Sequence, residues 1–269
     1  MPRYFSCYSK QGRGSLTSFF LRLTKRKVDG MRRTALLVCA VMAALVLTSV
    51  TFFGAQEDTH AATSALVGKK VVIDPGHGGT DWGAQNLTYP SLVEKNQNLE
   101  VALKLKRLLE DPVSGGAKVY MTRTDDDQYL TNTQRANKAN SFKAADPGDY
   151  VLVSIHMNGA SNPSTDYTTT LYGKPRKDRA LANTVFTTLS ALPAAKGTGT
   201  IATRTPYQFA SGVLLKSDMP AIIAESVFIT SKDEGDLLYP EGDTRQDQIA
   251  QALKAGLESY FLKYPNGQP

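Results

Sequence analysis

Short apolar runs alternate with amphipathic stretches along most of this chain. Runs rich in Val, Ile, Ala and Thr predict strands at residues 70–74, 118–121, 150–155, 168–172 and 221–224. Apolar residues at helical spacing predict helices at residues 94–109, 131–144, 179–192 and 243–262, with a short helix after 231. Alternating strands and helices are typical of a single α/β domain with a mostly parallel, twisted sheet flanked by helices.

The N-terminal part follows a different pattern. Residues 1–33 contain nine Lys or Arg and one acid, and residues 34–55 form an uncharged run of 22 residues. As a helix this run would be about 33 Å long, enough to cross a hydrocarbon core of about 30 Å. We therefore expect either an uncleaved transmembrane anchor or a cleaved signal helix. In both cases the basic segment stays in the cytoplasm and the rest is exported.

The remaining boundaries follow from composition. Residues 56–68 are polar and small and are predicted to form a linker, residues 69–264 a single folded domain, and residues 265–269 a tail. From Thr63 onward 22 basic and 22 acidic residues cancel, so the net charge of +6 belongs to the N-terminal segment. The domain therefore gives no electrostatic reason to expect nucleic acid as a partner. Cys7 and Cys39 both precede it, which excludes a disulfide or a cysteine metal ligand there.

Two of the three histidines follow apolar strands. His77 closes VVIDPGH and His156 closes YVLVSIH, while Glu225 ends the strand PAIIAE and Glu94 follows the loop after the first strand. A single His or Glu of this kind is more often structural than functional. The carboxyl ends of parallel strands, however, meet at one edge of a sheet, where binding sites assemble. Two His and two Glu at such an edge are the ligands and base of a catalytic zinc hydrolase.

Five segments match a known family in order and spacing. VVIDPGHGGTDWGA, VEKNQNLEVA, a TR pair after a strand, VSIHMN and MPAIIAESVF resemble the zinc-dependent N-acetylmuramoyl-L-alanine amidases of the amidase-3 type, which are bacterial cell-wall hydrolases. The resemblance covers residues 71–261. It implies that residues 69–264 are a zinc amidase catalytic domain acting on peptidoglycan. It also implies a location on the extracytoplasmic side of a bacterial membrane, either anchored or secreted.

The resemblance implies a role for each of the four residues. His77, Glu94 and His156 would ligate one Zn²⁺ ion, which leaves a fourth position for water. Zinc-bound water would be the nucleophile, with its pKa lowered toward about 7. Glu225 would be the general base, taking a proton from that water and returning it to the departing amine. The cleaved bond would be the amide between the lactyl carboxyl of N-acetylmuramic acid and L-alanine.

Four further residues are weaker candidates. Asp74 is expected either to orient His77 through a hydrogen bond or to satisfy turn amides. Asn158 is expected to contact substrate or to brace its loop. Arg123 and Arg135 are candidates for holding carboxylates of the stem peptide, with an ordinary surface position as the alternative.

One departure from the family pattern keeps a second interpretation open. The family usually shows an apolar residue and Gly after the catalytic glutamate, and Ser226 and Val227 stand there. The alternative is therefore a catalytically weakened relative that binds peptidoglycan or activates a partner hydrolase. A zinc hydrolase acting on another amide is a third interpretation. The sequence leaves a protein activator unidentified.

Overall fold

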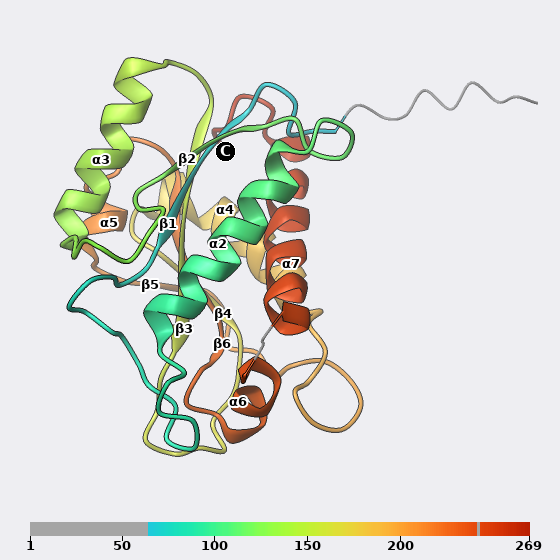
Figure 1. The fold of residues 1–269 in the computed structure, drawn as a ribbon. Helices are drawn as coiled ribbons and strands as arrows, with labels where there is room; N and C mark the ends of the chain where they lie inside the picture. The colour runs from blue at the N-terminus through green and yellow to red at the C-terminus, as the bar shows by residue number, and fades with distance from the viewer. Residues whose placement is uncertain (1–63, 241–242) are drawn as a thin grey trace, which may run out of the picture. The chain divides into compact units, whose positions relative to one another are not determined.

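The computed structural model describes residues 64–240 and 243–269, which contain one six-stranded sheet (Figure 1). Its strands are β1 (Lys70–Pro75), β2 (Lys118–Met121), β3 (Tyr150–Asn158), β4 (Thr169–Tyr172), β5 (Tyr207–Gln208) and β6 (Ala221–Phe228), in the order β2-β1-β3-β6-β4-β5. Strands β2, β1, β3 and β6 are parallel, whereas β4 runs antiparallel to β6 and β5 runs parallel to β4. The sheet is therefore mixed, with a parallel half that matches the predicted arrangement.

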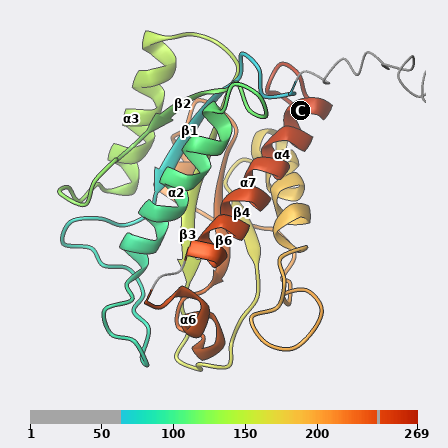
Figure 2. The same ribbon diagram turned by 45° about the vertical axis from the view of Figure 1, so that its right-hand side comes forward.

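Helices cover both faces of the sheet (Figure 2). Helices α2 (Glu94–Glu110), α4 (Pro175–Leu189) and α7 (Asp243–Lys263) pack on one face, and α3 (Asn132–Ala145) and α5 (Gly212–Leu215) on the other, while α6 (Lys232–Leu238) follows β6. Side chains of β1 alternate between the two layers, since Val71 and Ile73 join the core under α2 and α7 and Val72 joins the core on the opposite face. The result is a three-layer α/β domain.

The predicted elements are confirmed, with differences at their ends. The capping box that opens α3 is present, because Thr131 accepts a hydrogen bond from the backbone of Gln134. Helix α4 begins at Pro175, earlier than predicted, since Pro occupies its first turn and Asp178 accepts from the backbone N–H of Lys174 at 2.7 Å. Strand β5 and helix α5 were not predicted, because two and four residues are too short to show a period.

The predictions for residues 1–33 and 34–55 lie outside the described residues, as does most of the predicted linker. The choice between an anchor and a cleaved signal therefore stays a prediction. Within residues 64–240 and 243–269, no helix is both long and apolar enough to span a bilayer.

Candidate metal centre

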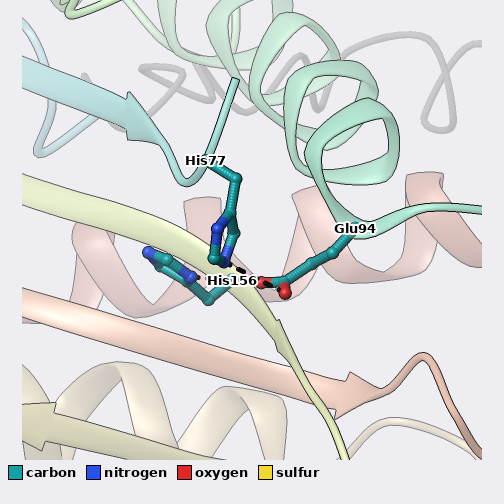
Figure 3. A group of neighbouring side chains, drawn as sticks. All are labelled: His77, Glu94 and His156. Carbon is teal, nitrogen blue, oxygen red and sulfur yellow. Dashed lines mark hydrogen bonds and ion pairs between the residues drawn. The ribbon is translucent and has the colours of Figure 1, made fainter. Parts of the chain in front are cut away.

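Three side chains converge at the carboxyl edge of the parallel strands (Figure 3). His77 lies in the loop after β1, Glu94 is the first residue of α2, and His156 lies near the end of β3. The two oxygens of Glu94 face one histidine each: Oε2 lies 3.1 Å from His77 Nε2, and Oε1 lies 3.1 Å from His156 Nδ1. The two rings meet edge to face, with centroids 4.9 Å apart. The sequence-predicted ligand set is thus brought together by the fold.

The backbone near His77 can approach the side chains of His156 and Glu94 this closely only because two of its residues are glycines. A Cβ on Gly76 would lie 2.3 Å from His156 Cε1, and a Cβ on Gly83 would lie 2.5 Å from Glu94 Oε2. His77 itself has φ +59°, a left-handed conformation that is uncommon outside glycine. This backbone conformation costs about 1–3 kcal/mol and persists only when the surrounding structure holds the residue in place.

The Glu94 carboxylate is buried and fully engaged. It is 3% exposed, and it accepts backbone N–H bonds from Ala84 at 2.9 Å and Met157 at 3.1 Å and an amide bond from Asn98 at 3.2 Å. Burial alone would raise its pKa, but the hydrogen bonds and charges of the two histidines outweigh burial and lower the pKa well below its usual range. Glu94 therefore remains an anion, as a metal ligand must.

The histidines share this electrostatic environment. Burial alone would lower the pKa of each imidazole, but the hydrogen bond and charge of Glu94 raise the pKa of both His77 and His156 above the ordinary value. Asp81 Oδ2 lies 2.9 Å from Nδ1 of His77, the ring nitrogen that faces away from Glu94. A carboxylate on the second nitrogen of a ligating histidine fixes the tautomer and orientation of its ring.

The donor set fits a zinc ion. One donor atom from each of His77, Glu94 and His156 lies within 4.8 Å of the others. Two imidazoles with one carboxylate are a common catalytic zinc set, with ligand bonds of about 2.0–2.2 Å. A cavity of about 210 Å³, lined by both histidines, Asp81 and Tyr129 among others, lies beside the cluster.

Glu225 lies directly opposite His156 on the neighbouring strand. The two residues are Cα partners in the parallel pairing of β3 and β6, so their side chains point to the same face of the sheet. Its Oε2 atom is buried and has no hydrogen-bond partner among residues 64–240 and 243–269. Burial raises the pKa of Glu225 to about 7, while the two histidines act in the opposite direction. A buried carboxyl oxygen that no described residue bonds is costly for the fold and points to a functional role.

Comparison with known proteins connects this geometry to a family. The family model described as N-acetylmuramoyl-L-alanine amidase matches residues 71–259. The chain belongs to this family. The resemblance predicted from the five sequence segments is therefore confirmed, and these residues form an amidase-3 domain.

Individual relatives agree with this assignment. A probable cell wall amidase, LytH, from Staphylococcus epidermidis is 31% identical over 204 residues, which cover 76% of this chain and 62% of that protein. This chain therefore spans less than two thirds of the length of that curated relative. An N-acetylmuramoyl-L-alanine amidase structure from Clostridium difficile 630 is 34% identical with a TM-score of 0.61, covering 72% of this chain and 97% of that one. The Clostridioides difficile CwlD amidase, solved in complex with the GerS lipoprotein, is 25% identical with a TM-score of 0.60, covering 72% and 99%.

Asp74 forms a hydrogen bond neither with the His77 ring nor with a turn amide in the described part of the chain, the two roles that the sequence suggested for it. Its carboxylate is fully buried and accepts hydrogen bonds from Ser154 at 2.6 Å, from Thr122, and from Arg135 at 2.8 Å. Burial alone would raise the pKa of Asp74, but the charge of Arg135 and these hydrogen bonds lower it below 3.8. In this amidase domain Asp74 holds Arg135, and Asp81 is the carboxylate beside the ring.

Neither candidate arginine faces solvent, because both donate hydrogen bonds to backbone carbonyl oxygens, including those of the loop after β1. Arg135 is 3% exposed and also donates to the carbonyl oxygens of Leu130, Pro75 and His77, the last at 2.7 Å. Arg123 is 4% exposed and donates to four backbone carbonyl oxygens, those of Pro75, Gly76, Lys95 and Asp125. The alternative of an ordinary surface position is therefore wrong for both arginines, which are buried and bonded to the backbone around His77, whereas contact with a stem peptide stays a prediction.

Asn158 and the two residues after Glu225 lie near the ends of β3 and β6. Asn158 is the last residue of β3, and its side-chain oxygen accepts a hydrogen bond from the backbone N–H of Gly159 at 3.2 Å. The side chain therefore braces the loop that follows, and its contact with substrate stays a proposal. Val227 is fully buried in the core under α2 and α7, and Ser226 Oγ is buried without a partner among the described residues. The departure after Glu225 is thus accommodated within the domain interior.

Two residues beside the cluster were not found from the sequence. Asp81 follows His77 by four positions, and Asn98 follows Glu94 by four positions on α2. The second spacing places two side chains on one face of a helix, and would have been a usable signal. The first depends on the path of an irregular loop, which residue spacing does not reveal.

Proposed function

We propose that this chain hydrolyses the amide bond between N-acetylmuramic acid and L-alanine in peptidoglycan. Membership of the amidase family supports the reaction class, and relatives named as cell wall amidases support the substrate. The observation that carries the proposal is the cluster of His77, Glu94 and His156 with Glu225 opposite His156, whose buried Oε2 has no hydrogen-bond partner in the described part of the chain.

A zinc ion is part of this proposal. His77, Glu94 and His156 would hold it, and when bound it would supply Lewis acidity to the scissile carbonyl and to the attacking water. Glu225 accepts a proton as the water oxygen bonds to the carbonyl carbon. It then donates that proton to the amine as the carbon–nitrogen bond breaks. A carboxylate in this place can serve as base in the first step and as acid in the second.

The remaining protein groups position the reacting ones. Asp81 lies 2.9 Å from Nδ1 of His77, where its charge would favour one orientation of the ring. The amide of Asn98 and the backbone N–H groups of Ala84 and Met157 fix the Glu94 carboxylate. The left-handed backbone of His77 is held by the hydrogen bond from Arg135 to its carbonyl oxygen. These contacts set the geometry before substrate arrives.

Location and partners extend the proposal. We place the activity on the extracytoplasmic side of a bacterial membrane, with residues 34–55 as an anchor or as a cleaved signal. The relatives named cell wall amidases support this placement. Because the CwlD amidase was solved with the GerS lipoprotein, a protein partner is also proposed here.

The test uses the purified full-length chain and intact peptidoglycan, with products identified by mass spectrometry. Free stem peptides that begin at L-alanine, lost with a chelator and restored by zinc, are expected. Glu225→Gln should retain zinc and lose turnover, whereas His77→Ala should lose both. Glu100→Gln is the matched control, because Glu100 is an exposed residue of α2. Stoichiometric zinc without released peptide in the unaltered chain would instead favour the binding or partner-activating alternative.

A further inference from the structure

A second cavity is lined by residues that neighbour Asp81 and Glu94 in the sequence. It has a volume of about 350 Å³, and we call it the Trp82 pocket. Its apolar wall and polar rim are formed chiefly by Trp82, Pro90, Val93, Ser91, Asn96 and Asp126. An apolar wall with a few polar groups is the usual composition of a small-molecule site.

Trp82 presents a large apolar surface at this point. Its side chain is 55% exposed, and the loop backbone fixes its place because Lys95 N–H donates to the Trp82 carbonyl oxygen. The preceding residue, Asp81, lines the metal-ligand cavity, and consecutive Cα atoms are about 3.8 Å apart. The Asp81 carboxylate bridges the turn, lying 2.9 Å from His77 Nδ1 and accepting from Gly83 N–H at 3.2 Å. The two cavities are therefore lined by consecutive residues of one loop, Asp81 and Trp82.

The charges in the pocket are paired with each other. Lys95 Nζ donates to an Asp126 carboxylate oxygen and to the Gly79 carbonyl oxygen at 2.8 Å. The exposed side chains of Ser91 and Asn96 take part in no side-chain hydrogen bond within the described part of the chain. The pocket thus offers uncommitted hydroxyl and amide groups without an unpaired charge among its lining residues.

We propose that the Trp82 pocket binds a sugar ring of the glycan strand, an inference that rests on the proposed amidase function. The apolar C–H face of a pyranose stacks on an indole, and its hydroxyl and acetamido groups can bond Ser91, Asn96 and Asp126. In peptidoglycan the muramic acid sugar carries the scissile amide, so sugars lie directly beside the reacting group. The stem peptide carries carboxylates, and a pocket whose one lysine is already paired with Asp126 does not favour them.

The binding test uses the fact that Trp82 is the only tryptophan in the chain. Tryptophan fluorescence of the full-length protein therefore reports on this pocket alone. A β-1,4-linked N-acetylglucosamine oligosaccharide, which has no scissile amide, should change that fluorescence saturably, whereas a free stem peptide should not. No saturable change with the oligosaccharide, or a saturable change with the peptide instead, would overturn the proposal.

The kinetic test uses two substitutions at Trp82 and one control. Trp82→Ala should raise KM for long glycan strands about tenfold, the scale of one lost aromatic contact, while kcat changes by less than about twofold. Trp82→Phe should recover part of this loss. Phe209 is the control residue: it is 46% exposed, and its backbone N–H donates to the carbonyl oxygen of Tyr172, at the end of β4 away from Glu225. Phe209→Ala should therefore leave KM and kcat unchanged. A fall in kcat with KM unchanged in Trp82→Ala would show a structural role instead.

The two proposals fail separately. If the unaltered chain releases no stem peptide, the amidase function fails, while the fluorescence titration still decides what the Trp82 pocket binds. If the chain is active but binds no oligosaccharide, only the sugar-binding inference fails.

Discussion

Replacing Arg135 with methionine is expected to destabilise the domain. Methionine fills part of the same space but provides no donors, so the hydrogen bonds to Asp74, Leu130, Pro75 and His77 are all lost. Asp74 is completely buried, and its ion pair with Arg135 is 2.8 Å long. Removing one partner of a buried ion pair costs about 3–5 kcal/mol. A domain of ordinary stability, about 5–15 kcal/mol, would lose a large fraction of it.

Urea unfolding of the full-length chain measures this loss as a change in the free energy of unfolding. Arg107→Met is the matched control, because Arg107 is exposed on α2 and a surface change should stay within about 0.5 kcal/mol. Asp74→Asn combined with Arg135→Met should cost less than the sum of the two single changes, by about 0.5–3 kcal/mol. The double variant no longer leaves a buried charge without its partner.

The competing interpretation gives the opposite pattern. A guanidinium group that held stem-peptide carboxylates would raise KM when removed and leave the unfolding transition in place. If Arg135→Met unfolds at the same urea concentration as Arg107→Met and only KM rises, the bracing role assigned to Arg135 is refuted.

Three other predictions concern the same edge of the sheet. Gly83→Ala should weaken zinc binding about tenfold in calorimetric titration, because the added Cβ would meet Glu94. Gly197→Ala is the control for backbone strain, since Gly197 also has a positive φ but an added Cβ there would meet nothing within 4 Å. Asp81→Asn should weaken zinc binding about 10–100-fold, and chelator competition that detects no change would contradict its orienting role. Because the pKa of Asp74 is lowered below 3.8, its stabilisation is present above that pH and is lost as the pH falls further. Acid unfolding of Asp74→Asn should lack this component.

The parallel half of the sheet could be predicted because its strands are continuous apolar runs. Residues 150–155 and 221–224 show this clearly, and both strands continue further in the structure, to Asn158 and Phe228. The additional residues pair with each other, so the ladder extends through polar positions that an apolar pattern does not include. The antiparallel direction of β4 could not be predicted, since a four-residue strand shows its composition but not its orientation.

The cluster of His77, Glu94 and His156 could be predicted, but the groups that hold it in place could not. His77, Glu94 and His156 are distinguished by their place after strands and by the family motifs. Arg123 and Arg135 are distinguished from surface arginines only by their partners, which are backbone carbonyl oxygens of the loop. Every residue type has such a carbonyl, so no pattern of side chains shows which of them needs a donor.

These contacts link the stability of the fold to metal binding. The loop after β1 leaves the sheet at Pro75, and its carbonyl oxygens are satisfied by Arg123 and Arg135 rather than by a neighbouring strand. Loss of Arg135 thus removes a hydrogen bond that holds the backbone of His77, one of the proposed metal ligands. An ion that binds only the folded state adds about 2.7 kcal/mol at a free concentration of 100 Kd. Zinc should therefore raise the unfolding free energy of the unaltered chain more than that of Arg135→Met. Equal increases would mean that the His77 backbone keeps its conformation without the arginine.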